Sequence, residues 1–191
     1  MPNVLERPIQ PYRFTVADYH AMAAAGILGE DDRVELIDGE IISMPPIGSP
    51  HGGRAKRLNQ LLNAAVGSRA LVAMQDPLVL GERSEPEPDI ALLRPRPDFY
   101  IDSHPGPADV LLLIEIADTS LAYDLRVKVP LYARHGIPEV WVIDVPHHRA
   151  LRFTQPDPTA GGYRDETTID ATQPVALPGL GGCVVDLRGV V

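Results

Sequence analysis

The sequence is poor in several residue types on which large classes of protein depend. Cys183 is the one cysteine among 191 residues, which excludes an intramolecular disulfide and a thiolate zinc cluster. Aromatic residues make up 5% of the chain, so no platform for stacking nucleic-acid bases is evident. No apolar stretch approaches the roughly 18–20 residues that cross a membrane, and the opening MPNVLERPIQ lacks the apolar region of a signal peptide. We therefore expect a cytoplasmic protein without membrane association.

Basic residues are scarce relative to acidic ones. Lys and Arg number 17 against 26 Asp and Glu, which gives a formal net charge of -9. Nonspecific affinity for nucleic acid comes largely from Lys and Arg that neutralise phosphates, so a broad and tight nucleic-acid clamp is disfavoured. A metal-dependent enzyme is compatible with this balance, because its acids hold cations while a local basic strip attracts the substrate.

Signatures of several other enzyme classes are also missing. The glycines at 161–162 and 179–182 lack the Lys-Ser/Thr and the following helix of a phosphate loop, so we expect no nucleotide cofactor. No nucleophile elbow and no Cys–His pairing is visible, which argues against a serine or cysteine hydrolase. His147 and His148 are adjacent and would point in different directions on a strand, which favours loop histidines over a metal site.

The hydrophobic pattern predicts an α/β fold with a central mixed sheet, flanking helices, a hairpin near the N-terminus and antiparallel strands near the C-terminus. We expect one domain over residues 14–191, preceded by an extended arm over residues 1–13. A capping box at Thr15 and Asp18 predicts the first helix, and Asp38-Gly39 predicts a type I′ hairpin turn. The other predicted segments are helices from His51 to about Val66 and from Leu121 to His135, and strands at Val34–Ile37, Glu40–Met44, Leu71–Met74, Leu78–Leu80, Ile90–Leu93, Asp109–Asp118, Glu139–Val145, Arg149–Thr154, Gly162–Thr168 and Val184–Leu187.

The most informative stretch is the apolar run Val110–Ile116. A short run of this kind, followed by Asp, Thr and Ser, is typical of a central strand that is covered on both faces. Glu115 lies inside the run, and a buried carboxylate is costly unless it is paired or binds a metal. From this strand alone, a satisfied structural glutamate and a metal ligand are equally good interpretations. Asp89 directly precedes another apolar strand, and two such acids can converge on a hard divalent cation.

Three polar residues recur at a spacing of four after this strand: Asp124, Lys128 and Tyr132. The spacing places them on one face of the predicted helix. Taken alone, Asp124 and Lys128 would be a surface ion pair of little energetic value, and Tyr132 a packed aromatic residue with a solvated hydroxyl. Beside two convergent acids, the same face becomes a candidate part of a site. Pro130 lies inside the helix and predicts a kink there, or a later start of the helix.

The helix that is predicted after Pro50 carries the densest group of basic residues in the chain, namely Arg54, Lys56 and Arg57. They are either solvated helix residues or a strip that faces phosphates beside the site. His51 is next to the helix N-terminus and could also meet a phosphate, although a lone histidine is more often structural.

These motifs together resemble the Uma2 family, which consists of restriction-endonuclease-like proteins within the PD-(D/E)XK nuclease superfamily. The resemblance covers roughly residues 14–187. It rests on Pro88-Asp89, on Glu115, on the helix with Asp124, Lys128 and Tyr132, on GIPEVWVID from Gly136 to Asp144, on VELIDGE from Val34 to Glu40, on Pro50-His51 and on Pro178-Gly179-Leu180.

The resemblance implies a restriction-endonuclease-like core and a metal-dependent endonuclease that hydrolyses phosphodiester bonds of DNA. Asp89 and Glu115 would hold one or two Mg²⁺ or Mn²⁺ ions, with the main-chain carbonyl of Ile116 as a further ligand. Glu35 would add a metal ligand or orient a water. A homodimer is plausible by the same resemblance, because duplex DNA offers two strands to cut. The residues that would bind substrate or support the site are His51, Arg54, Arg57, Asp124 and Tyr132.

One departure from the superfamily pattern matters. The pattern places a lysine two residues after the glutamate, where this sequence has Ala117. Either the lysine has migrated to the next helix as Lys128, whose pKa would fall near a cation and help a base role, or the site is catalytically inactive. An inactive protein would be a binding or scaffold homodimer, joined through the arm and the 94–107 loop. We favour the migrated lysine.

Overall fold

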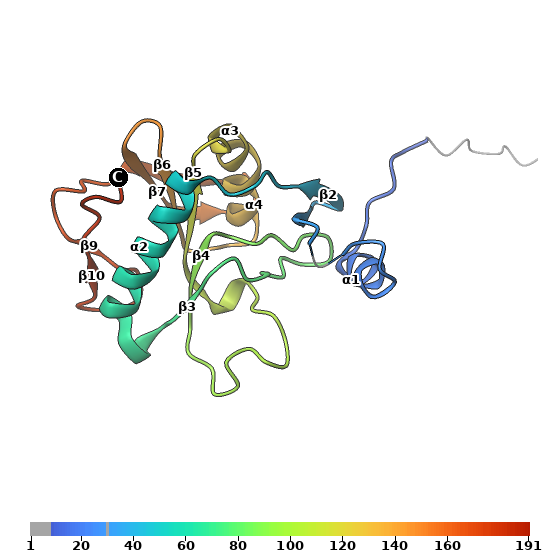
Figure 1. The fold of residues 1–191 in the computed structure, drawn as a ribbon, viewed down its shortest axis with the longest axis horizontal. Coiled ribbons are helices and arrows are strands. Elements are labelled where there is room, and N and C mark those ends of the chain that lie inside the picture. The colour runs from blue at the N-terminus through green and yellow to red at the C-terminus, as the bar shows by residue number, and fades with distance from the viewer. Residues whose placement is uncertain (1–8, 30) are drawn as a thin grey trace, which may run out of the picture.

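The structure, a computed structural model, describes residues 9–29 and 31–191. It is built around a six-stranded sheet in which β5 and β6 run parallel and the other neighbouring pairs run antiparallel (Figure 1). In order across the sheet, the strands are β3 (Leu71–Ala73), β4 (Ile90–Leu93), β5 (Val110–Ala117), β6 (Glu139–Asp144), β7 (Arg149–Asp157) and β8 (Gly162–Thr168). The predicted α/β fold with a central mixed sheet is confirmed.

Strand β5 lies at the centre of this sheet, and all eight of its residues are buried. Its parallel pairing with β6 requires a crossover, and the helical segment between the two strands supplies it. Side chains alternate along a strand, so Ile114 and Ile116 face one side of the sheet while Leu113, Glu115 and Ala117 face the other. The two sets of apolar residues belong to separate buried clusters, one on each face.

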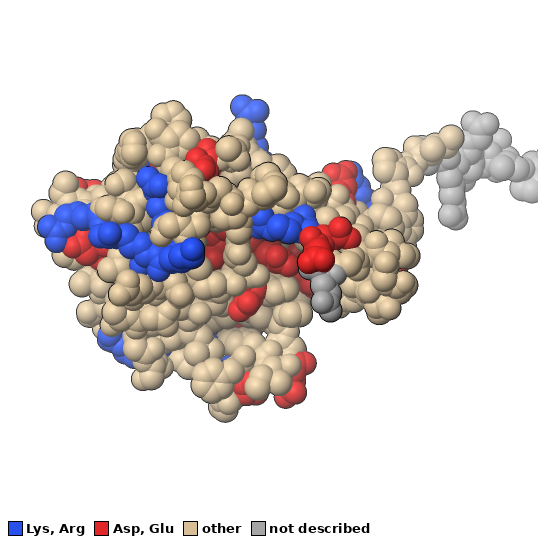
Figure 2. Space-filling model, viewed as in Figure 1, with Lys and Arg blue, Asp and Glu red and all other residues tan. Residues whose placement is uncertain are grey.

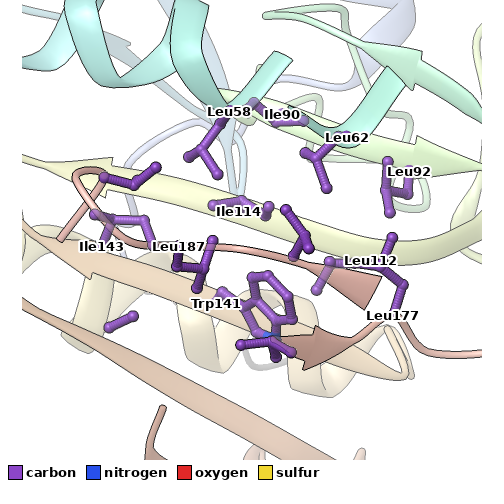
Figure 3. Packing of buried hydrophobic residues seen from close by; sticks show 14 of the residues in the cluster. Leu58, Leu62, Ile90, Leu92, Leu112, Ile114, Trp141, Ile143, Leu177 and Leu187 are labelled. Atoms are coloured by element: carbon purple, nitrogen blue, oxygen red, sulfur yellow. The ribbon is translucent and has the colours of Figure 1, made fainter. Parts of the chain in front are cut away.

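Helix α2 (Ser49–Val66) covers the first face, with a two-stranded sheet formed by β9 (Val175–Ala176) and β10 (Val184–Val185). Buried residues recur every four positions along α2, at Leu58, Leu62 and Val66. Figure 3 shows Leu58 and Leu62 pointing at the sheet, with Ile114 and Trp141 beneath them. The regular spacing of these residues explains why the helix was predictable.

The second face carries α3 (Leu121–Tyr123), the π-helical turn η3 (Asp124–Lys128) and α4 (Val129–Arg134). The predicted helix from Leu121 to His135 is therefore three joined segments. Pro130 has no N–H and its ring would clash with the carbonyl four residues back in a regular helix. The chain widens before it, where the N–H of Val129 donates to the carbonyl of Asp124, five residues back. Gly136, with φ 71°, ends the helix as predicted.

The N-terminal region contains α1 (Val16–Ala24) and the hairpin of β1 (Val34–Ile37) and β2 (Glu40–Ser43). The capping box of Thr15 and Asp18 is present as predicted. Asp38 and Gly39 both have positive φ, 50° and 80°, as a type I′ turn requires. Helix α1 buries no residue and lies to one side of the sheet, next to the β1–β2 hairpin (Figure 1). Residues 1–8 of the predicted arm lie outside the described residues.

The prediction of a strand at Leu78–Leu80 is wrong, and that of a strand at Val184–Leu187 is confirmed only in part. Leu78–Leu80 is not a strand, although Leu78 and Leu80 are buried, because their N–H groups donate within the loop, to Pro86 O and Ser84 O. The segment Val184–Leu187 forms only the short β10, which pairs with β9 instead of joining the main sheet. Short 3₁₀ turns η1 (Gly67–Arg69) and η2 (Pro107–Asp109) complete the elements. Among the described residues, no helix is long and apolar enough to cross a membrane.

Candidate active site

Asp89 and Glu115 lie side by side because of the register of β4 and β5. Ile90 pairs with Ile114 in this antiparallel pair, so the residue before Ile90 lies opposite the residue after Ile114. The N–H of Asp89 donates to Glu115 Oε2 at 3.4 Å, and the N–H of Ile116 donates to Asp89 Oδ2 at 2.8 Å. The two predicted acids are thus brought together by the sheet itself.

The helical segment after β5 brings Lys128 and Tyr132 to the same carboxylate. Lys128 Nζ lies 3.4 Å from Glu115 Oε1, and the Tyr132 hydroxyl donates to that oxygen. Asp124 accepts a hydrogen bond from Ser120 Oγ at 2.6 Å. Asp124 and Lys128 are each 2% exposed, so the interpretation of this face as a solvated surface ion pair is wrong.

Glu35 reaches the site from β1 and contacts the ammonium group of Lys128. Its Oε1 lies 2.9 Å from Lys128 Nζ and accepts the N–H of Glu87 at 3.1 Å. Its Oε2 is buried and has no hydrogen-bond partner within residues 9–29 and 31–191. A buried carboxylate oxygen without a donor is costly, which makes this atom available to a ligand.

His51, in the first turn of α2, holds the other acid. Its Nε2 lies 2.9 Å from Asp89 Oδ2, so Nε2 carries the hydrogen and Nδ1 is the acceptor of the ring. Nδ1 is buried and no partner for it is found among the described side chains. The helix therefore positions the imidazole between the carboxylate and the pocket.

Sequence reasoning missed Gln75, which follows β3. Its Nε2 donates to Asp89 Oδ1 at 3.4 Å, and its backbone is left-handed, with φ 53°. A residue other than glycine rarely adopts this conformation, and such positions cluster at functional sites. A glutamine before Asp76-Pro77 carries no signal of this role, because the contact depends on the β3–β4 pairing.

The acidic pocket is the open cleft that these residues line: Glu35, His51, Gln75, Asp89, Glu115, Asp124 and Lys128. On the face shown in Figure 2, acidic side chains lie in a hollow between basic side chains on either side. Arg54 and Arg57 do not line this pocket. They line a separate hollow on α2, together with Ser49 and Pro50.

Burial and the crowding of carboxylates shift the pKa values of the site. Burial raises the pKa of Glu115 to about 8, with smaller contributions from Asp89, Asp124 and Glu35 and an opposing one from Lys128. Burial likewise raises the pKa of Asp124 to about 6. For Lys128, burial alone would lower the pKa, but the carboxylates of Glu115, Glu35 and Asp124 together raise it. The fall of the Lys128 pKa beside a bound cation stays a prediction; in these surroundings the carboxylates keep the residue an ammonium at neutral pH.

The oxygen atoms of the pocket fit a hard divalent cation in an open site. Among the described residues, no group of three or more His, Cys, Asp or Glu side chains is arranged to hold a metal ion. Asp89 and Glu115 each have one oxygen bound by short contacts, and the other is approached only at 3.4 Å. Mg²⁺ binds through one or two carboxylates and keeps several waters, so two partly free carboxylates are a suitable donor set.

Comparison with known proteins gives the family and the fold of the chain. The Uma2 family model, described as "Putative restriction endonuclease", matches residues 16–188. The chain is also similar to a crystal structure from Anabaena variabilis ATCC 29413, described as a "putative nuclease belonging to DUF820". The TM-score is 0.69 at 17% sequence identity, over 96% of this chain and 97% of that one, which shows a shared fold. No curated protein matches the sequence.

Proposed function

This chain belongs to the Uma2 family, and from that premise we propose that it is a metal-dependent endonuclease that hydrolyses phosphodiester bonds of DNA. Membership of the family implies a nucleic acid as the substrate and a divalent metal ion as the cofactor. One observation carries the proposal: an ammonium group, Lys128 Nζ, lies 3.4 Å from Glu115 Oε1 in a pocket that also contains Asp89. Two carboxylates and a lysine are the groups that metal-assisted phosphodiester hydrolysis requires.

Asp89 and Glu115 are the proposed metal ligands, with the main-chain carbonyl of Ile116, and Mg²⁺ or Mn²⁺ is the proposed ion. A divalent ion bound there would neutralise charge on the scissile phosphate and lower the pKa of a bound water. Tyr132 fixes Glu115 through its hydroxyl, and His51 fixes Asp89. Each contact occupies one carboxylate oxygen. The other oxygen, Glu115 Oε2 or Asp89 Oδ1, has no contact shorter than 3.4 Å among the described residues.

The position of Lys128 supports the proposal that the site works with Ala117 at the usual lysine position. Residues 115 and 117 face the same side of β5, and the helical segment packs on that side. Lys128 therefore approaches Glu115 from the helical segment that packs on this face of β5. A lysine at position 117 would approach Glu115 from the same strand. Because Lys128 is an ammonium, we propose that it orients the attacking water and stabilises negative charge, and that it is not the base. Glu35 holds the ammonium in place.

A second candidate function is a binding or scaffold protein that has kept the fold without catalysis. The observation that favours it is the pairing of Lys128 with both Glu35 and Glu115, because these contacts also stabilise the protein without any substrate. The two functions differ in one measurable respect, which is metal-dependent cleavage.

We propose that the protein works as a homodimer in the cytoplasm, where its substrate lies. Large apolar side chains on the 94–107 loop support the dimer, since Phe99 is 67% and Ile101 is 84% exposed. Light scattering would show twice the 20.8 kDa mass of the chain if the dimer forms. A monomer at micromolar concentration would contradict it.

The test of the enzyme proposal is cleavage of supercoiled plasmid in Mg²⁺, in Mn²⁺ and in EDTA. We expect metal-dependent nicking by the wild type and a loss of at least about 100-fold in Glu115→Ala, which lacks a proposed ligand. Glu166→Ala is the matched control, because Glu166 is an exposed residue of β8 outside the pocket. Nicking that is unchanged in Glu115→Ala would contradict the assignment of the site.

A further inference from the structure

The first turn of α2 separates the acidic pocket from a second hollow of opposite charge. Gly48 and His51 line the acidic pocket, whereas Ser49 and Pro50 line the second hollow. We call the second one the basic hollow; its charged lining residues are Arg54, Lys56 and Arg57. Figure 2 shows basic side chains gathered over the region of α2, beside the acidic ones. The acidic pocket and the basic hollow are therefore neighbours on either side of one helical turn.

The cations of the basic hollow form no ion pair among the described residues. Within residues 9–29 and 31–191, no carboxylate lies within 4.0 Å of the charged nitrogens of Arg54, Lys56 or Arg57. The acid beside them, Asp186, is already paired with Arg188. Three neighbouring cations without an ion-pair partner are notable in a chain in which 26 acidic residues outnumber 17 basic ones.

The two arginines of the basic hollow are nevertheless held in fixed directions. Arg54 Nε donates to Val190 O at 2.8 Å, and Arg57 Nη2 donates to Arg188 O at 2.9 Å. Gly189, with φ 73°, leaves the space for this: a Cβ there would lie 3.1 Å from Arg57 Nη2. Main-chain carbonyls orient a guanidinium without cancelling its charge, so the groups are preorganised for an external anion.

We propose that the basic hollow binds successive phosphates of the DNA strand whose scissile phosphate lies in the acidic pocket. The strand would cross the first turn of α2 between the two. This rests on the proposed function and adds the path of the substrate. Residues 54–57 of α2 rise about 4.5 Å at about 1.5 Å per residue. A DNA strand presents a phosphate about every 3.4 Å of rise, so two neighbouring phosphates can meet the three cations.

The test is the salt dependence of duplex DNA binding, measured by fluorescence anisotropy in EDTA so that no cleavage occurs. Each phosphate contact contributes about 0.9 to the slope of log K against log salt. We expect a slope shallower by about 0.9 in Lys56→Ala and by about 1.8 in the double variant Lys56→Ala/Arg57→Ala. Between 50 and 200 mM salt, each contact then accounts for roughly 3.5-fold in affinity.

Arg69→Ala is the matched control. Its guanidinium is also held by a main-chain carbonyl of the C-terminal region, Gly181 O at 3.2 Å, but it lies beyond the end of α2. We expect its slope to equal that of the wild type. Lys56 is exposed and makes no side-chain hydrogen bond among the described residues, so Lys56→Ala tests the proposal even if Arg57→Ala fails to fold.

The outcomes separate this inference from the proposed function. A slope that is unchanged in Lys56→Ala, an equal change in Arg69→Ala, or an absence of DNA binding at low salt would overturn the inference. If cleavage occurs with unchanged slopes, the nuclease stands and the strand takes another path. If the slopes change but no metal supports cleavage, the basic hollow stands and the nuclease proposal fails. Slope changes that appear only with duplex RNA would overturn the choice of DNA.

Discussion

Replacing Lys128 by methionine isolates the energetic role of the ammonium group between Glu35 and Glu115. Both carboxylates are buried, at 3% and 2% exposure, and each lies within 4.0 Å of Lys128 Nζ. Glu115 already carries a proton at neutral pH, because burial raises its pKa to about 8. Without the ammonium, the buried carboxylate of Glu35 has no counter-charge. The cost of the substitution is therefore the neutralisation of this one glutamate.

That cost depends on pH in a calculable way. A glutamate in water has a pKa of about 4.3, so protonating one costs about 3.7 kcal/mol at pH 7 and about 1 kcal/mol at pH 5. The value at pH 7 agrees with the roughly 3–5 kcal/mol lost when one partner of a buried ion pair is removed. We expect Lys128→Met to lower the free energy of unfolding by about these amounts at the two pH values.

The assay is urea denaturation of the wild type and the variant at both pH values, followed by circular dichroism. Lys56→Met is the matched control, because the chain has two lysines and Lys56 is exposed, so its effect should stay within about 0.5 kcal/mol. A loss in Lys128→Met below about 1 kcal/mol at pH 7, or an equal loss at pH 5, would refute the argument that the carboxylate of Glu35 depends on this ammonium.

Three further predictions follow from the same contacts. Tyr132→Phe removes a donor to a buried carboxylate and should cost about 1.5–3 kcal/mol in denaturant unfolding, whereas the exposed Tyr12→Phe should be nearly neutral. Mn²⁺ affinity, measured by calorimetry, should fall more than about tenfold in Glu115→Gln; no change would exclude it as a ligand. With pKa values raised to about 6 in Asp124 and about 8 in Glu115, the folded metal-free protein binds more protons than the unfolded chain between about pH 4 and 8. Thermal stability in EDTA should therefore fall as pH rises through this window, with a shallower slope in Glu115→Gln.

Local signals in the sequence were sufficient for most of the secondary structure. The capping box at Thr15, the Asp38-Gly39 turn and the apolar run of β5 each act within a few residues, so no tertiary information was needed. The prediction of a strand at Leu78–Leu80 was wrong because tertiary information was needed there. Its leucines are buried by the loops around them, and an apolar run alone does not distinguish burial from strand pairing.

The same distinction between local signals and tertiary packing holds for the contacts of the candidate site. The approach of Asp89 to Glu115 follows from neighbouring strands, and the face shared by Lys128 and Tyr132 follows from helical spacing. The contact of Lys128 with Glu35 joins residues 93 positions apart and depends on how the β1–β2 hairpin packs. The directions of Arg54 and Arg57 depend on the C-terminal carbonyls that hold them, and the pKa of Lys128 depends on three carboxylates that only the folded chain assembles.

The proposed role of Lys128 is the central claim, and plasmid cleavage by Lys128→Met tests it most directly. The assay is done at a pH and temperature where circular dichroism shows the variant to be folded, and Mn²⁺ binding is measured in the same samples. We predict that Mn²⁺ still binds through Asp89 and Glu115, because the ammonium is not a ligand, while nicking falls by at least about 100-fold. Nicking at the wild-type rate by a folded, Mn²⁺-bound Lys128→Met protein would contradict the account.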